Sequence, residues 1–279
     1  NDKPYDRFVK EQVAGDEIDP TNSENLVATG FLRMGPWEQT GMSVFKETRQ
    51  MWLDDVTDSV GQTFLAHAMQ CAKCHDHKFD PVPTRDYYGM MAVFSTTQFA
   101  ERKAPFLSSE SKEGFDAFAK LVQSKVSSYE KQKKSLAQKI NQLKKAETGN
   151  AKVGDNGLDP GDEASQSRIF KNLIRHRIEL DRVEPVTHAV YTGKTVPMKN
   201  VQGRLNVPKD PWAKGYLDPD VIYDGGSVYS QGEAVRPGGL SAAESLGGIN
   251  PRPFPADKGK RRLALAEWIV NEKNPLTAR

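Results

Sequence analysis

The sequence predicts a mainly α-helical protein: a helical domain with an antiparallel helical-hairpin arm and a small, loop-rich β section. Apolar residues recur at helical spacing over residues 47–70. Two heptad seams flank a polar stretch at 148–162, a pattern typical of two paired helices. The β-type runs are short and surrounded by glycine and proline. With 279 residues, at roughly 100–200 residues per domain, we expect one large or two ordinary domains.

Residues 1–111 are predicted to form a helical domain that contains the chemical site. A first amphipathic helix is expected to stop at Gly15. The clearest helix, over 47–70, has an apolar stripe that repeats mostly every four residues: Leu53, Val56, Val60 and Phe64. This helix is expected to lead directly to Cys71. Three acidic residues, Asp54, Asp55 and Asp58, are interpreted as a first turn favoured by the helix dipole, rather than as a carboxylate cluster for acid–base chemistry.

Residues 112–185 are predicted to form the hairpin arm. Its first seam alternates spacings of four and three: Val122, Val126, Tyr129, Lys133, Leu136, Ile140 and Leu143. Its second seam ends before Pro185: Ile169, Leu173, His176, Leu180 and Val183. The intervening segment, 148–162, is rich in Gly, Asn, Asp and Pro and is predicted to be the tip.

The remaining residues divide into an irregular region and a final helical segment. Residues 186–256 contain short strands, predicted at 188–191 and 221–223, among many glycines and prolines. Residues 257–279 return to a helical pattern and are interpreted as the start of a second, truncated domain. Since the chain begins without methionine and ends directly after this helix, we expect it to be a fragment of a longer protein.

Charge and hydropathy exclude several classes of protein. Thirty-nine basic and 37 acidic residues give a net charge of +2, which supplies no field for holding nucleic acid. No apolar run approaches 18 residues, so no transmembrane segment is expected. Two cysteines are too few for a disulfide-rich scaffold.

The strongest chemical signal is the segment Cys71-Ala72-Lys73-Cys74-His75. Cys-x-x-Cys-His is the attachment motif of c-type haem. Two thiols three positions apart add to the two vinyl groups of the haem, and the following histidine is then placed under the iron. The motif therefore predicts haem c as cofactor, bound by Cys71, Cys74 and His75.

The residues that follow keep other interpretations open. His75, His77 and Asp80 are ligand-type side chains that would suit zinc or another divalent metal, with the cysteines or His67 completing a site. A redox dithiol is a third interpretation of the cysteine pair. His77 as a plain surface histidine and Asp80 as a turn residue are the simplest interpretations of those two positions.

A six-coordinate haem would also need a second axial ligand on the far side of the iron. The candidates from the sequence are Met69, His67, Met90 and Met91. Met90 and Met91 lie in an apolar stretch where core packing is the better expectation. No signature singles out one of the four.

Several stretches together carry a resemblance to a known family. They are Lys3 to Phe8, Ala14 to Glu17, Ala28 to Arg33, Leu53 to Val56, Gly61 to Leu65, Cys71 to Pro81, Arg85 to Tyr88, Arg262 to Ala264, and Asn274 to Arg279. With these, the chain resembles the cytochrome-c-like proteins abundant in Planctomycetes, which are built from paired domains of unknown function. The motif Cys-x-x-Cys-His-Asp-His-Lys-Phe-Asp-Pro is specific to that family.

The resemblance implies an exported, multidomain protein whose genes often lie among sulfatase and polysaccharide-degradation genes. It therefore predicts an extracytoplasmic location, in the periplasm or at the cell surface, and a redox partner or a cell-surface protein complex. Together with the motif, it favours a redox or electron-transfer protein with c-type haem. The alternative is a non-haem metal-binding protein, either a structural scaffold or a polysaccharide-related hydrolase, that uses the segment from Cys71 to Asp80.

Overall fold

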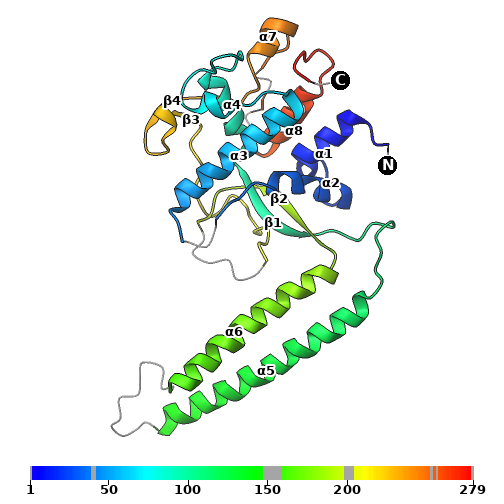
Figure 1. Cartoon of the computed structure of the whole chain (residues 1–279), viewed down its shortest axis with the longest axis vertical. Coiled ribbons are helices and arrows are strands. Elements are labelled where there is room, and N and C mark those ends of the chain that lie inside the picture. The colour runs from blue at the N-terminus through cyan, green and yellow to red at the C-terminus, as the bar shows by residue number, and fades with distance from the viewer. Residues whose placement is uncertain are drawn as a thin grey trace. The chain divides into compact units, whose positions relative to one another are not determined.

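The computed structural model describes residues 2–38, 42–146, 159–197, 204–251, 254–255 and 257–277. These residues form a mainly α-helical structure, which confirms the predicted fold class (Figure 1). The helices are α1 Tyr5–Ile18, α2 Ser23–Ala28, α3 Phe45–Leu65, α4 Thr84–Phe94, α5 Phe115–Ala146, α6 Pro160–Leu180, α7 Ala242–Gly247 and α8 Arg261–Ile269. The strands are β1 Thr97–Lys103, β2 Val186–Thr192, β3 Val221–Tyr223 and β4 Gln231–Ala234.

The strands form two small antiparallel sheets of two strands each. In the first, β1 pairs with β2 from Thr97 opposite Thr192 to Lys103 opposite Val186. In the second, β3 pairs with β4, with Val221 opposite Ala234. Strands were predicted at the positions of β2 and β3. β1 and β4 were not predicted. Only Ser95 and Thr96 separate β1 from α4, with no glycine or proline to mark the end of the helix.

The chain folds as two compact units. The first comprises 1–107, 186–201 and 205–279, and the second comprises 108–185 and 202–204. The final helix α8 packs on α1 inside the first unit. That 257–279 begin a further domain stays a prediction.

The core of the first unit is built around α3 and α4. On α3, the predicted stripe is buried, and Trp52 joins it. On α4, every residue from Asp86 to Phe94 is buried, so the helix is covered on all sides. A helix that is apolar all round belongs in a core. This core carries the cysteine segment, which lies between the two helices in the sequence.

The expectation that the first helix stops at Gly15 is wrong, since α1 continues to Ile18 with a kink at Ala14. Gly15 is instead required by close packing. A Cβ at this position would lie 2.2 Å from the backbone oxygen of Asn25. The glycine therefore lets α1 approach the backbone of α2. Glycine in a helix is less favourable than alanine because it loses more conformational entropy on folding.

A buried charge cluster joins the two ends of the first unit. We call Asp16, Glu17 and Arg262 the clasp. The guanidinium of Arg262 donates to both carboxylate oxygens of Asp16, at 2.7 and 2.9 Å, and lies 3.2 Å from Glu17. Glu17 in turn accepts from the backbone N–H of Leu263 at 2.8 Å. Side chains of the clasp are at most 3% exposed, so the charges are paired and removed from water.

The second unit is the predicted antiparallel hairpin. The two seams meet in a small apolar cluster whose buried members are Val122, Val126, Ile169 and Leu173. The ring of Tyr129 stacks on His176, with centroids 5.7 Å apart. Two further ion pairs cross between the helices, Lys139–Asp162 and Arg177–Glu130. Of the predicted tip, 148–158 lies outside the described residues, and α6 begins after its N-cap, Asp159.

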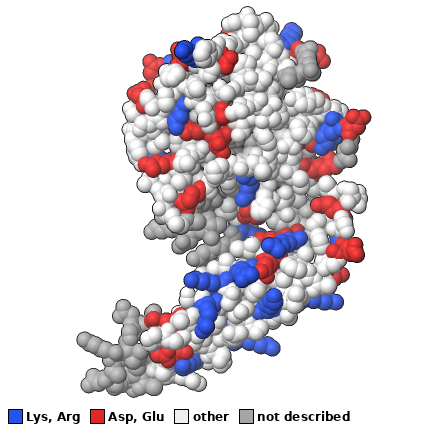
Figure 2. All heavy atoms as spheres, viewed as in Figure 1, with Lys and Arg blue, Asp and Glu red and all other residues white. Residues whose placement is uncertain are grey.

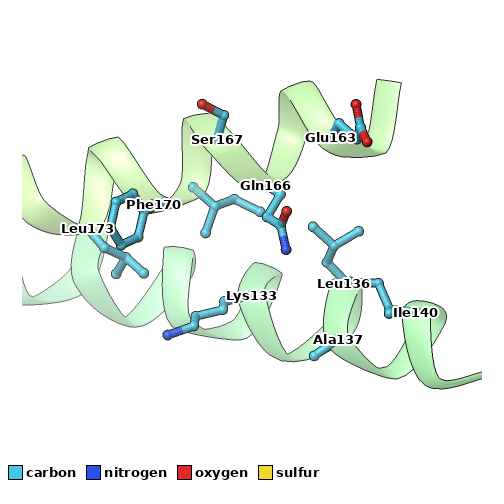
Figure 3. A pocket seen from close by; sticks show the side chains of 10 residues that line it. Lys133, Leu136, Ala137, Ile140, Glu163, Gln166, Ser167, Phe170 and Leu173 are labelled. Atoms are coloured by element: carbon cyan, nitrogen blue, oxygen red, sulfur yellow. The ribbon is translucent and has the colours of Figure 1, made fainter. Parts of the chain in front are cut away.

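The hairpin seam is looser toward the tip. There the two helices enclose a cavity of about 390 Å³, and Leu136 and Gln166 extend into the space between them (Figure 3). Helix α5 carries eight lysines against two acidic residues. Lysine and arginine side chains accordingly lie along the hairpin on the face shown in Figure 2. Within the described residues, no helix has the length and apolar character that a membrane span requires.

Candidate functional site

The cysteine segment is delivered by a tight reversal after α3. The helix ends at Leu65, and Ala66 adopts a left-handed conformation with φ 57°. Cys71 then lies in a short 3₁₀ turn, Gln70–Lys73. The expectation that the long helix leads directly to the cysteines is therefore corrected, since they stand on a separate turn.

Asp58 fixes the start of that turn from the preceding helix. Its Oδ1 accepts from the backbone N–H groups of Met69, at 2.6 Å, and Gln70, at 3.2 Å. Its Oδ2 accepts from the side chain of Gln62 at 2.6 Å. A carboxylate that accepts several N–H bonds is held in one orientation. The turn is thereby attached to α3 through backbone atoms.

Both thiols are free and both cysteines are exposed. The Sγ of Cys74 lies 3.5 Å from the backbone oxygen of Gly225. The neighbouring Gly226 has φ +76°, and a Cβ there would lie 2.8 Å from the same Sγ. Glycine at position 226 is therefore favoured for two reasons: it adopts the left-handed backbone conformation without strain, and it leaves room for the thiol of Cys74.

A polar network lies beneath the cysteine turn. The hydroxyl of Tyr88 donates toward the backbone oxygens of Lys73, at 2.9 Å, and Tyr223, at 3.1 Å. Lys73 pairs with Asp54 at 2.7 Å, and Tyr87 donates to the same carboxylate at 2.6 Å. Burial raises the pKa of both tyrosines, so the hydroxyls remain protonated donors. The turn that carries Cys74 is thus held by groups from α3, α4 and β3.

The interpretation of the acidic residues of α3 as a first turn is wrong. Because the helix begins at Phe45, Asp54, Asp55 and Asp58 lie in its middle, beyond the reach of the N-terminal dipole. Asp54 is instead the centre of the network under the site, and Asp58 anchors the turn. Asp55 stands against Gly35, where a Cβ would lie 2.5 Å from its carboxylate.

His75 is exposed, and its ring is oriented by a backbone carbonyl. The Nδ1 atom lies 2.8 Å from the oxygen of Asp76. Because a carbonyl only accepts, Nδ1 carries the proton in this contact, and the lone pair of the neutral ring is on Nε2. Metal-bound histidines usually have this arrangement, with one ring N–H donated to a carbonyl or carboxylate and the other nitrogen on the metal.

His77 has the opposite arrangement. Its Nδ1 accepts from the backbone N–H of Asp80 at 2.9 Å, while its own backbone N–H donates to Val82 at 3.0 Å. The Nδ1 lone pair is therefore used, and the neutral ring carries its proton on Nε2. Asp80 Oδ2 lies 3.3 Å from the same nitrogen. In this geometry His77 closes the loop that leads into α4, and it offers no free nitrogen lone pair.

The four candidates for a distal ligand have partners within the fold. Met69 is fully buried, and a Cβ on Gly61 would lie 2.5 Å from its sulfur. Met90 and Met91 are in the core, where Met91 accepts from Gln50 at 3.1 Å. His67 Nδ1 lies 2.6 Å from the oxygen of Leu65. The core packing expected of Met90 and Met91 is observed, and a distal ligand stays a prediction.

Across the part of the chain that the structure describes, no group of three or more His, Cys, Asp or Glu side chains is arranged to hold a metal ion. The residues around the site that sequence reasoning missed are Gly225, Gly226, Tyr88 and Tyr223. The adjacent glycines were the available signal, because such a pair often marks a turn with positive φ. Their proximity to Cys74, about 150 positions earlier in the chain, is a property of the fold.

Comparison with known proteins places this site in the part of the chain that is similar to a family. The model of the PSCyt2 family, described as a protein of unknown function (DUF1549), matches residues 1–99. PSCyt2 is a planctomycete cytochrome-c-associated domain of unknown function. The matched residues include α1 to α4 and the whole segment from Cys71 to Asp80. No curated protein matches the chain, and no solved structure does.

Proposed function

We propose that the chain binds a c-type haem covalently through Cys71 and Cys74, with His75 as the protein ligand of the iron, and that it transfers electrons. The observation that carries this proposal is the contrast between the two histidines. His75 donates through Nδ1 and keeps Nε2 for a metal, whereas His77 accepts through Nδ1. The similarity to a cytochrome-associated family supports the same context.

The residues present fit the group. Two free, exposed thiols on one short turn meet the requirement of adding to two neighbouring vinyl groups. Haem iron, when bound, supplies one-electron redox chemistry. Asp76 holds the ring of His75, and Tyr88 holds the peptide that joins Lys73 to Cys74. The chain thereby presents two thiols and an imidazole from a rigid support.

The exposure of this turn fits an electron-transfer role better than an enclosed chemical reaction. Cys71, Cys74 and His75 are all exposed, so a partner protein would reach the site without a conformational change. Haem attachment to such a motif takes place outside the cytoplasm, so the proposal includes an extracytoplasmic location. The partner would be a redox protein or a cell-surface complex.

The test is production of the full chain in a bacterial periplasm together with a haem-attachment system. We expect a haem-stained band after denaturation and a haemochrome spectrum with one haem per chain. Cys71→Ser should reduce the number of thioether bonds, and His75→Ala should change the visible spectrum of the haem because the iron loses its protein ligand. His77→Gln is the matched control, because it replaces another histidine only two positions from His75. We expect its haem content to equal that of the wild type.

The alternative of a non-haem metal site gives a different pattern. A colourless protein that carries stoichiometric zinc, and loses it in both Cys71→Ser and His77→Gln, would reject the haem proposal. Metal analysis of the two variants side by side distinguishes the alternatives, because the loss of a direct ligand lowers affinity by at least the ~10–100-fold seen for outer-shell partners.

A further inference from the structure

The first unit contains a second feature that the proposed function does not use. A cavity of about 490 Å³ lies where α3 begins and where β3 and β4 face it. Its apolar and aromatic lining includes Phe45, Leu53, Tyr216, Tyr223 and Val228. A concave, mostly apolar site of this size, with a few polar groups at its edge, is typical of small-molecule binding.

The charged side chains that line this cavity include one positive charge that has no acidic partner within the described part of the chain. Three charged side chains line it: Lys46, Arg49 and Asp218. Arg49 is buried and donates through Nε to Asp218 at 2.9 Å, so these two neutralise each other. Lys46 has no ion pair among the described residues, and its ammonium lies 5.1 Å from the ring centre of Tyr229. The cavity therefore carries a net positive charge at Lys46.

The start of α3 adds to this preference. Val44 is the N-cap of the 21-residue helix and has no side-chain oxygen to cap its first amides. Val44, Phe45 and Lys46 all line the cavity. The positive end of the helix dipole thus faces the same space as the ammonium group of Lys46, and both favour an anionic group there.

The aromatic part of the wall indicates what the rest of a ligand should be. Burial raises the pKa of Tyr216 and of Tyr223 to about 12, so both phenols stay neutral at pH 7 and add no negative charge. Rings from two tyrosines and a phenylalanine offer flat apolar surface, against which another ring packs favourably. The ligand should therefore have an aromatic body and an anionic end.

We propose that this cavity binds a small aromatic monoanion of the carboxylate type, with its ring against Tyr216 and Tyr223 and its carboxylate near Lys46. Tyr223 also contacts the ring of Tyr88, with centroids 5.7 Å apart, and it precedes the Gly225–Gly226 turn that touches Cys74. Tyr223 therefore connects the cavity to the cysteine turn. The binding proposal does not depend on haem.

Calorimetric titration of the full chain with 2-naphthoate, and in parallel with its uncharged alcohol, 2-naphthalenemethanol, tests the proposal. We expect one saturable site and an affinity about 3–5-fold higher for naphthoate, since a partly exposed ion pair contributes up to about 1 kcal/mol. Lys46→Gln should remove this preference and leave the affinity for the alcohol unchanged. Lys78→Gln is the control, because Lys78 also lies over an aromatic ring, 5.2 Å from that of Phe79, but outside the cavity.

Two wall variants show where the ligands bind. Val228→Trp should fill the cavity and reduce binding of both ligands at least tenfold. Tyr216→Ala changes a wall residue that is 36% exposed, and it should weaken both ligands without loss of folding. Absence of saturable binding to the wild type would overturn the proposal. Equal affinity for acid and alcohol, or unchanged binding in the folded Tyr216→Ala protein, would overturn it as well.

Discussion

The clasp and the cysteine turn both contain residues on which the family resemblance rests, yet they differ in every physical respect. In the clasp, Asp16 and Arg262 are almost completely buried, and their charges are paired at 2.7 and 2.9 Å. At the turn, Cys71 and His75 are exposed. Sequence signatures therefore mix two kinds of residue. Buried, paired groups stabilise the fold, and exposed side chains without such partners are available to bind a cofactor.

The largest effect on stability is expected from Arg262→Ala. It leaves the carboxylates of Asp16 and Glu17 buried without a counter-charge, and breaking such a pair costs about 3–5 kcal/mol. Urea unfolding followed by tryptophan fluorescence measures this, because all four tryptophans lie in the first unit.

Arg85→Ala serves as control for the clasp. Arg85 pairs with Glu233 at the surface, where the two side chains are 49% and 74% exposed, so its loss should change stability by less than about 1 kcal/mol. Equal losses in the two variants would mean that the clasp is no more important to the fold than a surface pair.

A smaller effect is expected from Asp58→Ala, at the junction between the core and the site. It removes the acceptor of the Met69 and Gln70 backbone N–H groups, and an unsatisfied buried donor costs about 1–3 kcal/mol. Since the same bonds hold the cysteine turn, alkylation of Cys71 by iodoacetamide should also become faster. Asp58→Asn keeps an oxygen acceptor and should recover much of both effects; failure to do so would show that the charge, not the hydrogen bond, is what matters.

A graded effect of pH is expected from the clasp. Burial is the main cause of the raised pKa of Glu17. A carboxyl whose pKa is higher in the folded than in the unfolded state binds protons more tightly when folded, so it favours folding at low pH. This contribution is lost as the pH rises from the unfolded pKa, about 4.3, through the folded value. Glu17→Gln should flatten the dependence of unfolding free energy on pH over that range, and an unchanged slope would contradict the assignment.

The sequence predicted those parts of the fold that depend on local pattern. The stripe of α3 and the two seams of the hairpin follow from periodicity, so α3, α5 and α6 were predicted, whereas α2, α4 and α7 were not. The sequence placed α3 at 47–70, whereas the helix runs from Phe45 to Leu65, so the predicted start is two residues late and the predicted end five residues late.

The candidate site was proposed from residue spacing alone, and its geometry comes from the structure. Cys71, Cys74 and His75 were proposed from their spacing; all three are exposed, Cys71 within the 3₁₀ turn, Cys74 at its end and His75 directly after it. The difference between His75 and His77 depends on which backbone atom meets each Nδ1, a carbonyl in one case and an N–H in the other. Loop geometry of this kind is set by the tertiary fold, and residue type alone does not specify it.

The smallest effect on stability, and the sharpest comparison, comes from the two histidines. His77→Ala removes the acceptor of the Asp80 N–H and should cost about 1 kcal/mol, the usual net value of such a bond. His75→Ala removes an exposed ring whose contact is with the adjacent residue, and should change stability by less than about 0.5 kcal/mol. If the proposed function is right, the two variants rank in the opposite order for iron ligation. His75→Ala, which barely changes stability, loses the protein ligand of the iron, and the less stable His77→Ala keeps it. Urea unfolding and haem spectra of the same two proteins measure both orders. A His77→Ala protein that loses iron ligation as completely as His75→Ala would show that the loop histidine belongs with the exposed chemical residues after all.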